Sequence, residues 1–284
     1  MTGGVDIGGS GPALLFCPAD RPDRYAKAAQ RSDVVILDLE DAVAPASRPG
    51  ARAALAAHPL DPTRTIVRVN PHGSADHTAD IAAALAAGYR TLMLPKAESA
   101  AAVRSVEALA AAGGTTGIGL VVLCETAAGV LAAPQLAAEE SVAALMWGAE
   151  DLVASLGGSS SRLPDGRYRD VARHARSAVL LAAGAHGKAA IDTVHLDIGD
   201  LSGLADEARD AVASGFRATA CIHPDQVSVI RDAYRPSAEQ LRRALALLQR
   251  AEGEAGVFRF EGQMVDEPVV RHARALLERA EHTV

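Results

Sequence analysis

The feature that most constrains this chain is an alternation of eight short apolar runs with alanine-rich stretches of helical spacing. Such alternation is typical of parallel strands joined by crossover helices, and it predicts an α/β protein. Clear helical stretches are Ala75–Ala87, Ser99–Ala112 and Leu201–Ser214. The predicted strands are Ala13–Cys17, Val34–Glu40, Thr65–Asn70, Thr91–Lys96, Ile118–Glu125, Val142–Trp147, Ala189–His195 and Thr219–His223.

Two architectures place parallel strands under helices: a closed (β/α)₈ TIM barrel and an open doubly wound sheet. Eight strands in 284 residues fit the closed barrel. A doubly wound nucleotide-binding sheet carries a Gly-x-Gly-x-x-Gly turn after its first strand. Here the segment Cys17–Asp20 follows instead and reads Cys-Pro-Ala-Asp. We therefore predict a TIM-barrel catalytic domain over residues 1–235.

The C-terminal part exceeds what a barrel requires. Helical stretches are predicted over Asp225–Tyr234, Ala238–Gly253 and Pro268–His282, and Ser237 has the character of a helix cap. The short segment Val257–Val265 between them suggests a hairpin or a lid. We expect residues 236–284 to form a helical extension.

Composition narrows the classes of function. Apolar residues make up 49% of the chain and aromatic residues only 3%, so the core must consist of small aliphatic side chains. A formal charge of −7 argues against a general nucleic-acid binder. Cys17, Cys124 and Cys221 lie in apolar runs, which indicates buried thiols in a reducing compartment. We see no signal peptide and no membrane span, and we expect a cytoplasmic protein.

Chemistry in a barrel is expected where the strands end and the following loops begin. Glu125 and Asp151 fall at the ends of neighbouring predicted strands. Two carboxylates held together repel each other unless a cation lies between them, and hard oxygen ligands suit Mg²⁺. The alternative is that both are solvated carboxylates at the rim, with Asp151 capping the next helix. The strand-end position of both residues favours a magnesium site.

Two cations also occupy strand ends. Arg68 lies in an apolar strand, and a buried arginine must meet an anion. That anion is either a developing enolate oxygen or a structural partner, Asp38 or Glu40. Lys96 is placed for Schiff-base chemistry with a ketone. Its alternative is an ion pair with Glu98 or Glu40, which would keep the amine protonated.

The strand-end strings resemble those of the citrate lyase β-subunit-like family, within the HpcH/HpaI aldolase and malyl-CoA lyase superfamily. They occur in order from about Leu14 to Arg279. One such string is weak evidence, whereas nine in order at the spacing of a barrel are specific. The strings are Leu15–Pro22, Val35–Val43, Val67–Pro71, Leu94–Ser99, Glu125–Ala127, Trp147–Leu152, Ala190–Asp192, Ile222–Pro224 and Gly262–Asp266.

The resemblance implies a barrel that forms a homotrimer, and Mg²⁺ held by Glu125 and Asp151. It implies that Arg68 contacts keto-acid or enolate oxygens. From the residues themselves, we expect Glu40 to be a catalytic partner that orients Arg68 and the metal-bound waters. It also implies that Asp266 reaches a neighbouring subunit's site as the proton-transfer group. From the sequence alone, Asp266 is an exposed acid on a loop.

The resemblance further implies that Arg21 and Lys27 meet the phosphates of CoA, and Arg24 belongs to the same basic turn. Solvated helix charges are the alternative for these three residues. The chain departs from its relatives at Cys17–Asp20, where Val-Pro-Gly-Asp is common, and at Trp147, where Phe is common. Neither departure removes an ionisable group.

The expected activity is Mg²⁺-dependent cleavage or formation of a carbon–carbon bond in a 3-hydroxy-acyl-CoA thioester of the malyl, citramalyl or citryl type. The products of cleavage are acetyl-CoA and a 2-keto acid: pyruvate, glyoxylate or oxaloacetate. Two other functions stay open. One is a β subunit of a citrate lyase complex, acting on an acyl-carrier-protein thioester, and the other is a Schiff-base aldolase that uses Lys96.

Overall fold

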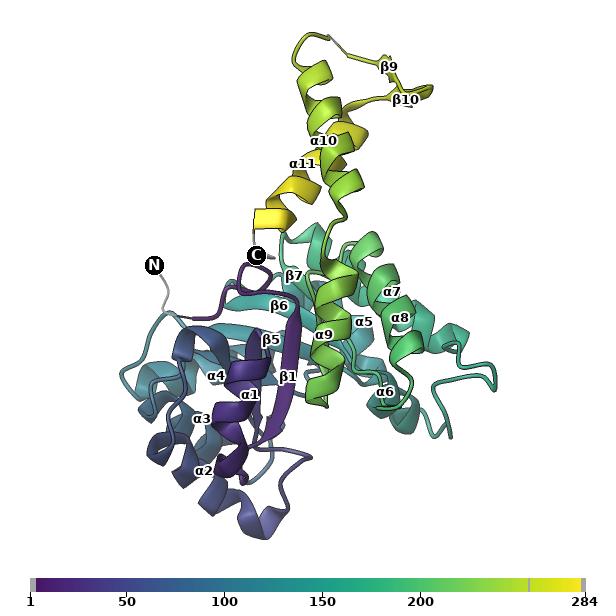
Figure 1. Ribbon diagram of the computed structural model, residues 1–284. Helices are drawn as coiled ribbons and strands as arrows, with labels where there is room; N and C mark the ends of the chain where they lie inside the picture. Colours follow the sequence, from purple (N-terminus) through teal and green to yellow (C-terminus); the bar gives the residue numbers. More distant parts are fainter. Residues whose placement is uncertain (1–3, 255, 282–284) are drawn as a thin grey trace.

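The computed structural model describes residues 4–254 and 256–281. Eight parallel strands close into a barrel in chain order, β1 to β8, and helices cover its outside (Figure 1). The predicted TIM barrel is therefore confirmed. The strands are β1 Ala13–Pro18, β2 Val34–Asp38, β3 Thr65–Arg68, β4 Thr91–Leu94, β5 Gly119–Cys124, β6 Val142–Trp147, β7 Ala189–Asp192 and β8 Ala218–Cys221.

Most of the predicted strands run past the observed C-terminal ends. The apolar pattern continues there, but the chain has already left the barrel at the rim. The short 3₁₀ helices are η1 Pro22–Arg24, η2 Pro45–Ser47 and η3 Pro62–Arg64. The α-helices of the barrel are α1 Tyr25–Arg31, α2 Arg48–Ala57, α3 His77–Ala86, α4 Ala100–Ala112, α5 Ala127–Ala137, α6 Ala149–Ser155, α7 Asp170–Ala185, α8 Leu201–Ser214 and α9 Pro224–Tyr234.

The strand register aligns side chains at the C-terminal rim. Pro18 of β1 pairs with Asp38 of β2, Asp38 pairs with Arg68 of β3, and Arg68 pairs with Met93 of β4. Asp38 and Arg68 are thus immediate neighbours at the end of their strands. The strand β1 also pairs with β8, through Ala13 and Thr219 among others, which closes the barrel.

The core has two apolar layers, as alternation along each strand requires. One layer fills the inside of the barrel, with Leu14, Ile36 and Met93 among its members. The other lies between the strands and the helices and includes Leu37 and Leu92. Aliphatic residues dominate both layers, as the low aromatic content predicts. The three cysteines are free thiols and buried, which confirms that part of the prediction.

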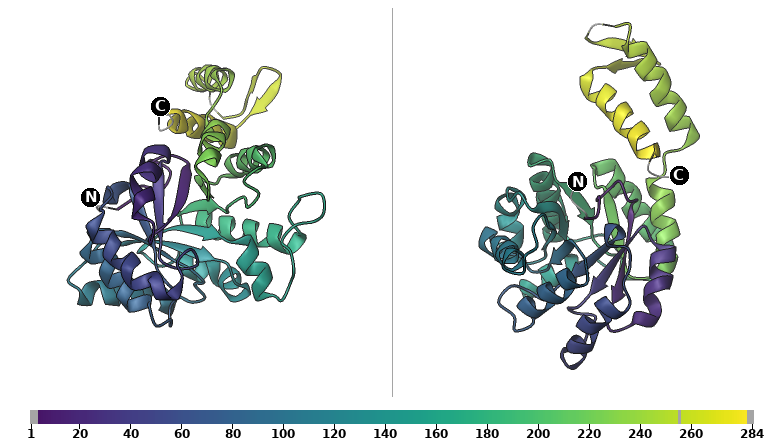
Figure 2. Two further views of the ribbon diagram at one scale, coloured as in Figure 1. Left: turned by 60° about the horizontal axis from the view of Figure 1, so that its bottom comes forward. Right: turned by 90° about the vertical axis from the view of Figure 1, so that its left-hand side faces the viewer.

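The C-terminal extension is an arm made of α10 Ala238–Ala251, a hairpin and α11 Glu267–Glu281. The hairpin pairs β9 Phe258–Phe260 with β10 Gln263–Val265, so the expected hairpin is present. Ser237 caps α10, as predicted. The arm has its own small apolar core, which includes Leu247, Val265 and Val270. Figures 1 and 2 show it projecting from the barrel.

The arm leaves the barrel at the rim where the strands begin, which is opposite to the rim at their C-terminal ends. The strand β8 ends at the same rim as the other strands, and α9 then returns along the outside of the barrel before α10 begins. The hairpin lies at the end of the arm farthest from the barrel (Figure 1). Within the described ranges, no helix is long and apolar enough to cross a membrane.

Candidate active site

Glu125 and Asp151 reach the same rim from neighbouring strands. Glu125 directly follows β5, and Asp151 lies in the first turn of α6, which follows β6. The alternative in which Asp151 caps this helix is wrong, because Gly148 is the cap residue and no side chain caps the helix. The Asp151 side chain is 41% exposed, and its carboxylate lies 3.6 Å from Lys96 Nζ.

Glu125 is only 3% exposed, which is unusual for a carboxylate. Burial, together with the negative charges of Asp151 and Glu40, raises its pKa to about 8. Its Oε1 accepts a hydrogen bond from the backbone N–H of Lys96 at 3.0 Å. A buried carboxylate in this electrostatic environment is stabilised by a cation.

The donor set fits a magnesium ion. Mg²⁺ prefers oxygen ligands, and it is commonly bound by one or two carboxylates while keeping several waters. Glu125 and Asp151 supply two such carboxylates at the rim. Among the described residues, no group of three or more His, Cys, Asp or Glu side chains is arranged to hold a metal ion. Two carboxylates, with water or substrate oxygens in the remaining positions, are a common ligand set for this ion.

Arg68 forms a fork with Asp38. Its Nε and Nη2 donate to the two carboxylate oxygens of Asp38 at 2.7 and 2.6 Å, and Nη1 lies 3.1 Å from Glu40 Oε2. The structural salt bridge, which the sequence left as an alternative, is present. Arg68 is 11% exposed and stacks over the ring of Phe16. A guanidinium has five N–H groups, so this pairing leaves donors on the Nη atoms for a further anion.

Lys96 is held by acids. Its Nζ lies 2.5 Å from Glu40 Oε1 and 3.3 Å from Asp41 Oδ2, while Glu98 is exposed. Of the two ion pairs considered for it, the one with Glu40 is present. The backbone of Lys96 has a φ of 49°, a left-handed conformation that costs a residue with a Cβ about 1–2 kcal/mol. That turn directs its N–H at Glu125.

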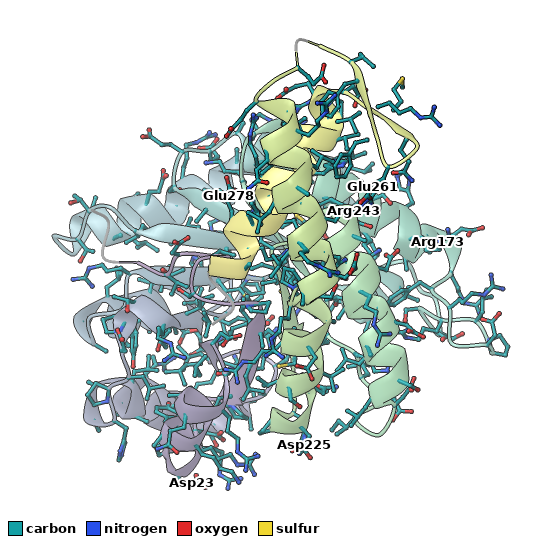
Figure 3. The ribbon with its side chains drawn as sticks, turned by 45° about the horizontal axis from the view of Figure 1, so that its top comes forward. Asp23, Arg173, Asp225, Arg243, Glu261 and Glu278 are labelled. Atoms are coloured by element: carbon teal, nitrogen blue, oxygen red, sulfur yellow. The ribbon has the colours of Figure 1, made fainter. Side chains whose placement is uncertain are left out.

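The basic turn follows β1 at the same rim. Arg21 is exposed and pairs with Asp23 at 3.0 and 2.8 Å, and Asp23 is labelled at the lower edge of the barrel in Figure 3. Arg24 and Lys27 are also exposed. These charges face solvent.

Asp266 does not join the cluster at the rim of its own barrel. It follows β10 on the arm and accepts a hydrogen bond from the N–H of Val269 at the start of α11. Arg243 of α10 pairs with Glu261 of the hairpin at 2.8 Å, which anchors the segment before Asp266 (Figure 3). The structure thus brings together Arg68, Glu40, Glu125 and Asp151, and leaves Asp266 apart.

Asn70 lies at a predicted strand end but received no role from the sequence, and Asp80 was not singled out. Asp80 of α3, which is fully buried, accepts hydrogen bonds from both the backbone and the side-chain amide of Asn70. The Asn70 side chain also donates to the carbonyl oxygen of Leu39, between Asp38 and Glu40. This tether fixes the ends of β2 and β3 relative to each other. The sequence signal that could have identified Asp80 is a single acidic residue on the buried face of an alanine-rich helix.

Trp147 packs in the layer between the strands and the helices, where it makes polar and aromatic contacts. It is fully buried at the end of β6, and its indole N–H donates to Asp192 at 2.6 Å. Its ring meets that of Tyr168 edge to face at 5.3 Å between centroids. Arg176 completes the neutralisation of Asp192 at 2.9 Å. The buried indole therefore has its own hydrogen-bond partner.

Comparison with known proteins gives consistent results along the whole chain. The family model described as HpcH/HpaI aldolase/citrate lyase matches residues 13–224, and a second, described as C–C bond lyase of the TIM-barrel fold, matches residues 170–283. A citrate lyase subunit beta-like protein of Mycobacterium tuberculosis is 54% identical, with 97% of this chain and 98% of the relative covered. An L-malyl-CoA/beta-methylmalyl-CoA lyase of Rhodobacter capsulatus is 31% identical, with 94% and 93% covered.

A solved structure agrees with the fold. The crystal structure of CitE from Mycobacterium tuberculosis, in complex with magnesium, acetoacetate and coenzyme A, has a TM-score of 0.88 and 55% identity. It covers 95% of this chain and 98% of that one. The residues that the HpcH/HpaI family model matches include the barrel strands and the rim described above. The chain therefore belongs to the HpcH/HpaI aldolase/citrate lyase family.

Proposed function

We propose that this protein is a Mg²⁺-dependent carbon–carbon lyase that acts on a 3-hydroxy-acyl-CoA thioester of the malyl, citramalyl or citryl type. The observation that carries the proposal is the position of two carboxylates, Glu125 and Asp151, at one rim with the fork of Arg68. A solved relative with magnesium, acetoacetate and coenzyme A, and a malyl-CoA lyase among the relatives, support the same chemistry.

The residues divide the work of a reversible aldol cleavage. Glu125 and Asp151 would hold the Mg²⁺ ion, which supplies a Lewis acid for the substrate carboxylate and hydroxyl. Arg68, oriented by Asp38 and Glu40, donates N–H groups to the oxygen on which negative charge develops. Cleavage passes the hydroxyl proton to water, breaks the bond between the two substrate carbons and leaves the acetyl-CoA enolate with a 2-keto acid.

The enolate carbon must then gain a proton, and we assign this step to Asp266 of a second copy. The arm leaves the barrel at the rim opposite to the site, so Asp266 is remote from the rim of its own chain. An arm that carries its own small core is suited to reach a neighbouring molecule. We propose that residues 1–235 form the catalytic barrel and that residues 236–284 cap the site of a neighbour in a homotrimer.

Free CoA, rather than an acyl-carrier protein, is the proposed carrier of the thioester. Arg21 and Lys27 lie beside the rim and would contact its phosphates, although Arg21 must exchange its pairing with Asp23 to do so. A protein of net charge −7 needs such a local basic patch to bind a polyanion. The alternative is a β subunit of a citrate lyase complex. It would act on a thioester carried by an acyl-carrier protein instead of free CoA.

The Schiff-base alternative is opposed by the surroundings of Lys96. Burial alone lowers the pKa of Lys96, but the hydrogen bond and charge of Glu40, with Glu125 and Asp41, outweigh burial and raise it. Imine formation needs the neutral amine. This environment holds the amine in its protonated form.

The test is an assay of the purified protein with Mg²⁺ against malyl-CoA, citramalyl-CoA and citryl-CoA, and against the same acids on an acyl-carrier protein. Release of acetyl-CoA, its loss in EDTA and its return with Mg²⁺ are the expected results. Activity that survives EDTA and is trapped by borohydride would favour Lys96 instead. Cleavage of carrier-protein thioesters alone would favour the citrate lyase complex.

A further inference from the structure

Lys96 contacts both proposed metal ligands through two different groups. Its backbone N–H donates to Glu125 Oε1 at 3.0 Å, and its Nζ lies 3.6 Å from Asp151 Oδ1. The left-handed backbone at this position makes both contacts possible from one residue. The turn is also packed closely, because a Cβ on Gly129 of α5 would lie 2.6 Å from the carbonyl oxygen of the next residue, Ala97.

The ammonium group of Lys96 also satisfies a buried acid. Glu40 is 2% exposed, and its Oε1 accepts the hydrogen bond from Nζ at 2.5 Å. Its other oxygen, Oε2, faces Arg68 at 3.1 Å. A buried carboxylate that loses one of its charged partners is strongly destabilising, so Lys96 has a role in the fold that does not depend on metal.

The site contains more acids than bases. Its two cations are Arg68 and Lys96, and Arg68 is engaged by Asp38 and Glu40. Lys96 is therefore the cation that faces the remaining acids. A divalent ion beside the same acids would repel a nearby ammonium group, since like charges a few ångströms apart interact by more than 1 kcal/mol at a protein surface. The five carboxylates of the cluster are Asp38, Glu40, Asp41, Glu125 and Asp151.

We propose that Lys96 is a positioning residue that competes with the divalent cation for Asp151. Its ammonium group stabilises the carboxylate cluster of the metal-free protein and weakens metal binding, while its backbone N–H keeps Glu125 oriented toward the site. This inference rests on the proposed metal site of Glu125 and Asp151. A merely structural lysine would affect stability and leave the affinity for metal unchanged.

The test is Lys96→Met, which removes the charge and keeps the backbone N–H and a stem of similar length. The affinity for Mn²⁺, which prefers the same oxygen ligands as Mg²⁺, is measured by calorimetry on the full chain. We expect Lys96→Met to bind Mn²⁺ about tenfold more tightly than the wild type, which corresponds to about 1.4 kcal/mol of removed repulsion. In EDTA its midpoint of thermal unfolding should be lower than that of the wild type.

Three further variants make the result decisive. Lys96→Arg keeps the charge and should bind Mn²⁺ like the wild type. Lys96→Gln keeps a donor for Glu40 and should bind more tightly than the wild type, even if Lys96→Met does not fold. Glu125→Ala should abolish binding.

The outcomes separate the two proposals. If the wild type does not bind Mn²⁺, or Glu125→Ala binds it equally well, the proposed metal site is wrong and the inference fails with it. A second outcome is that Glu125→Ala does not bind Mn²⁺, while Lys96→Met and Lys96→Gln bind it no more tightly than the wild type. In that case the competition proposed for Lys96 is wrong and the metal site stands.

Discussion

Gly148 lies against Glu125 so closely that a side chain at this position would displace the carboxylate. A Cβ built on Gly148 would lie 2.8 Å from the Cβ of Glu125 and 2.9 Å from its Oε2. The backbone at Gly148 is extended, with a φ of −125°, a conformation that any residue can adopt. Glycine is therefore needed here because there is no room for a side chain. The position of Glu125 thus depends on a neighbour that carries no functional group.

Gly148→Ala tests this dependence without removing any proposed ligand. The added methyl group forces Glu125 to move, so we expect Mn²⁺ affinity to fall by tenfold or more and stability to fall by about 1–3 kcal/mol. Calorimetry and chemical unfolding measure the two effects. The matched control is Gly184→Ala in α7, where an added Cβ meets nothing within 4 Å. Equal metal affinity in Gly148→Ala and the wild type would contradict the steric argument.

The raised pKa of Glu125 predicts a pH dependence of stability in EDTA. The folded protein holds this proton up to about pH 8, whereas the unfolded chain releases it near pH 4.5. Between these values the folded state binds more protons, so this group's contribution to stability falls as pH rises, by an amount on the order of a few kcal/mol. Urea unfolding at several pH values measures it.

Glu125→Gln provides the comparison for that profile, because the amide does not titrate. The difference in stability between the variant and the wild type should grow in favour of the variant from pH 5 to pH 8. Parallel profiles would show that Glu125 titrates normally. In the wild type, Mn²⁺ affinity should rise over the same interval, because metal and proton compete for one carboxylate.

Arg68→Lys keeps the charge but loses the planar fork that grips Asp38. We expect kcat/KM to fall by roughly 10²–10³, the usual cost of one lost oxyanion donor. Mn²⁺ affinity should stay within about twofold of the wild type, because Arg68 is not a proposed ligand and the charge is kept. Steady-state kinetics and calorimetry on the same preparation separate the two readouts. A loss of metal binding equal to the loss of activity would assign Arg68 to the metal site instead.

Asp266→Asn and Glu125→Ala should each be inactive, and their mixture should recover activity. In a mixed trimer that holds both variants, one of the three sites joins an intact barrel to an intact arm, so about a third of the wild-type activity is expected. Co-expression with two different tags, purification through both tags and a rate assay measure the recovery. Full activity of Asp266→Asn alone would refute the proton-transfer role. Absence of recovery from a folded mixed oligomer would place the arm's function within a single chain.

The alternation of apolar runs determined the barrel, because strand and helix periodicity are local properties that the side chains themselves carry. The same pattern predicted that Arg68, Lys96, Glu125 and Asp151 would share one rim, since parallel strands all end on the same side. Those predictions needed only the order of the strands. The role of Asp266 came from the family resemblance, because no local sequence pattern predicts which site an acidic residue on a loop will reach.

Only the tertiary structure decided which charges pair. Arg68 meets Asp38 because β2 and β3 align in one particular register. Lys96 turns to Glu40 and Asp151 because its backbone is left-handed and the next residue, Ala97, packs closely against Gly129 of α5. Neither register nor a single backbone torsion is encoded in periodicity. Both follow from how the strands and helices pack once the barrel closes, and that packing also directs the arm away from its own site.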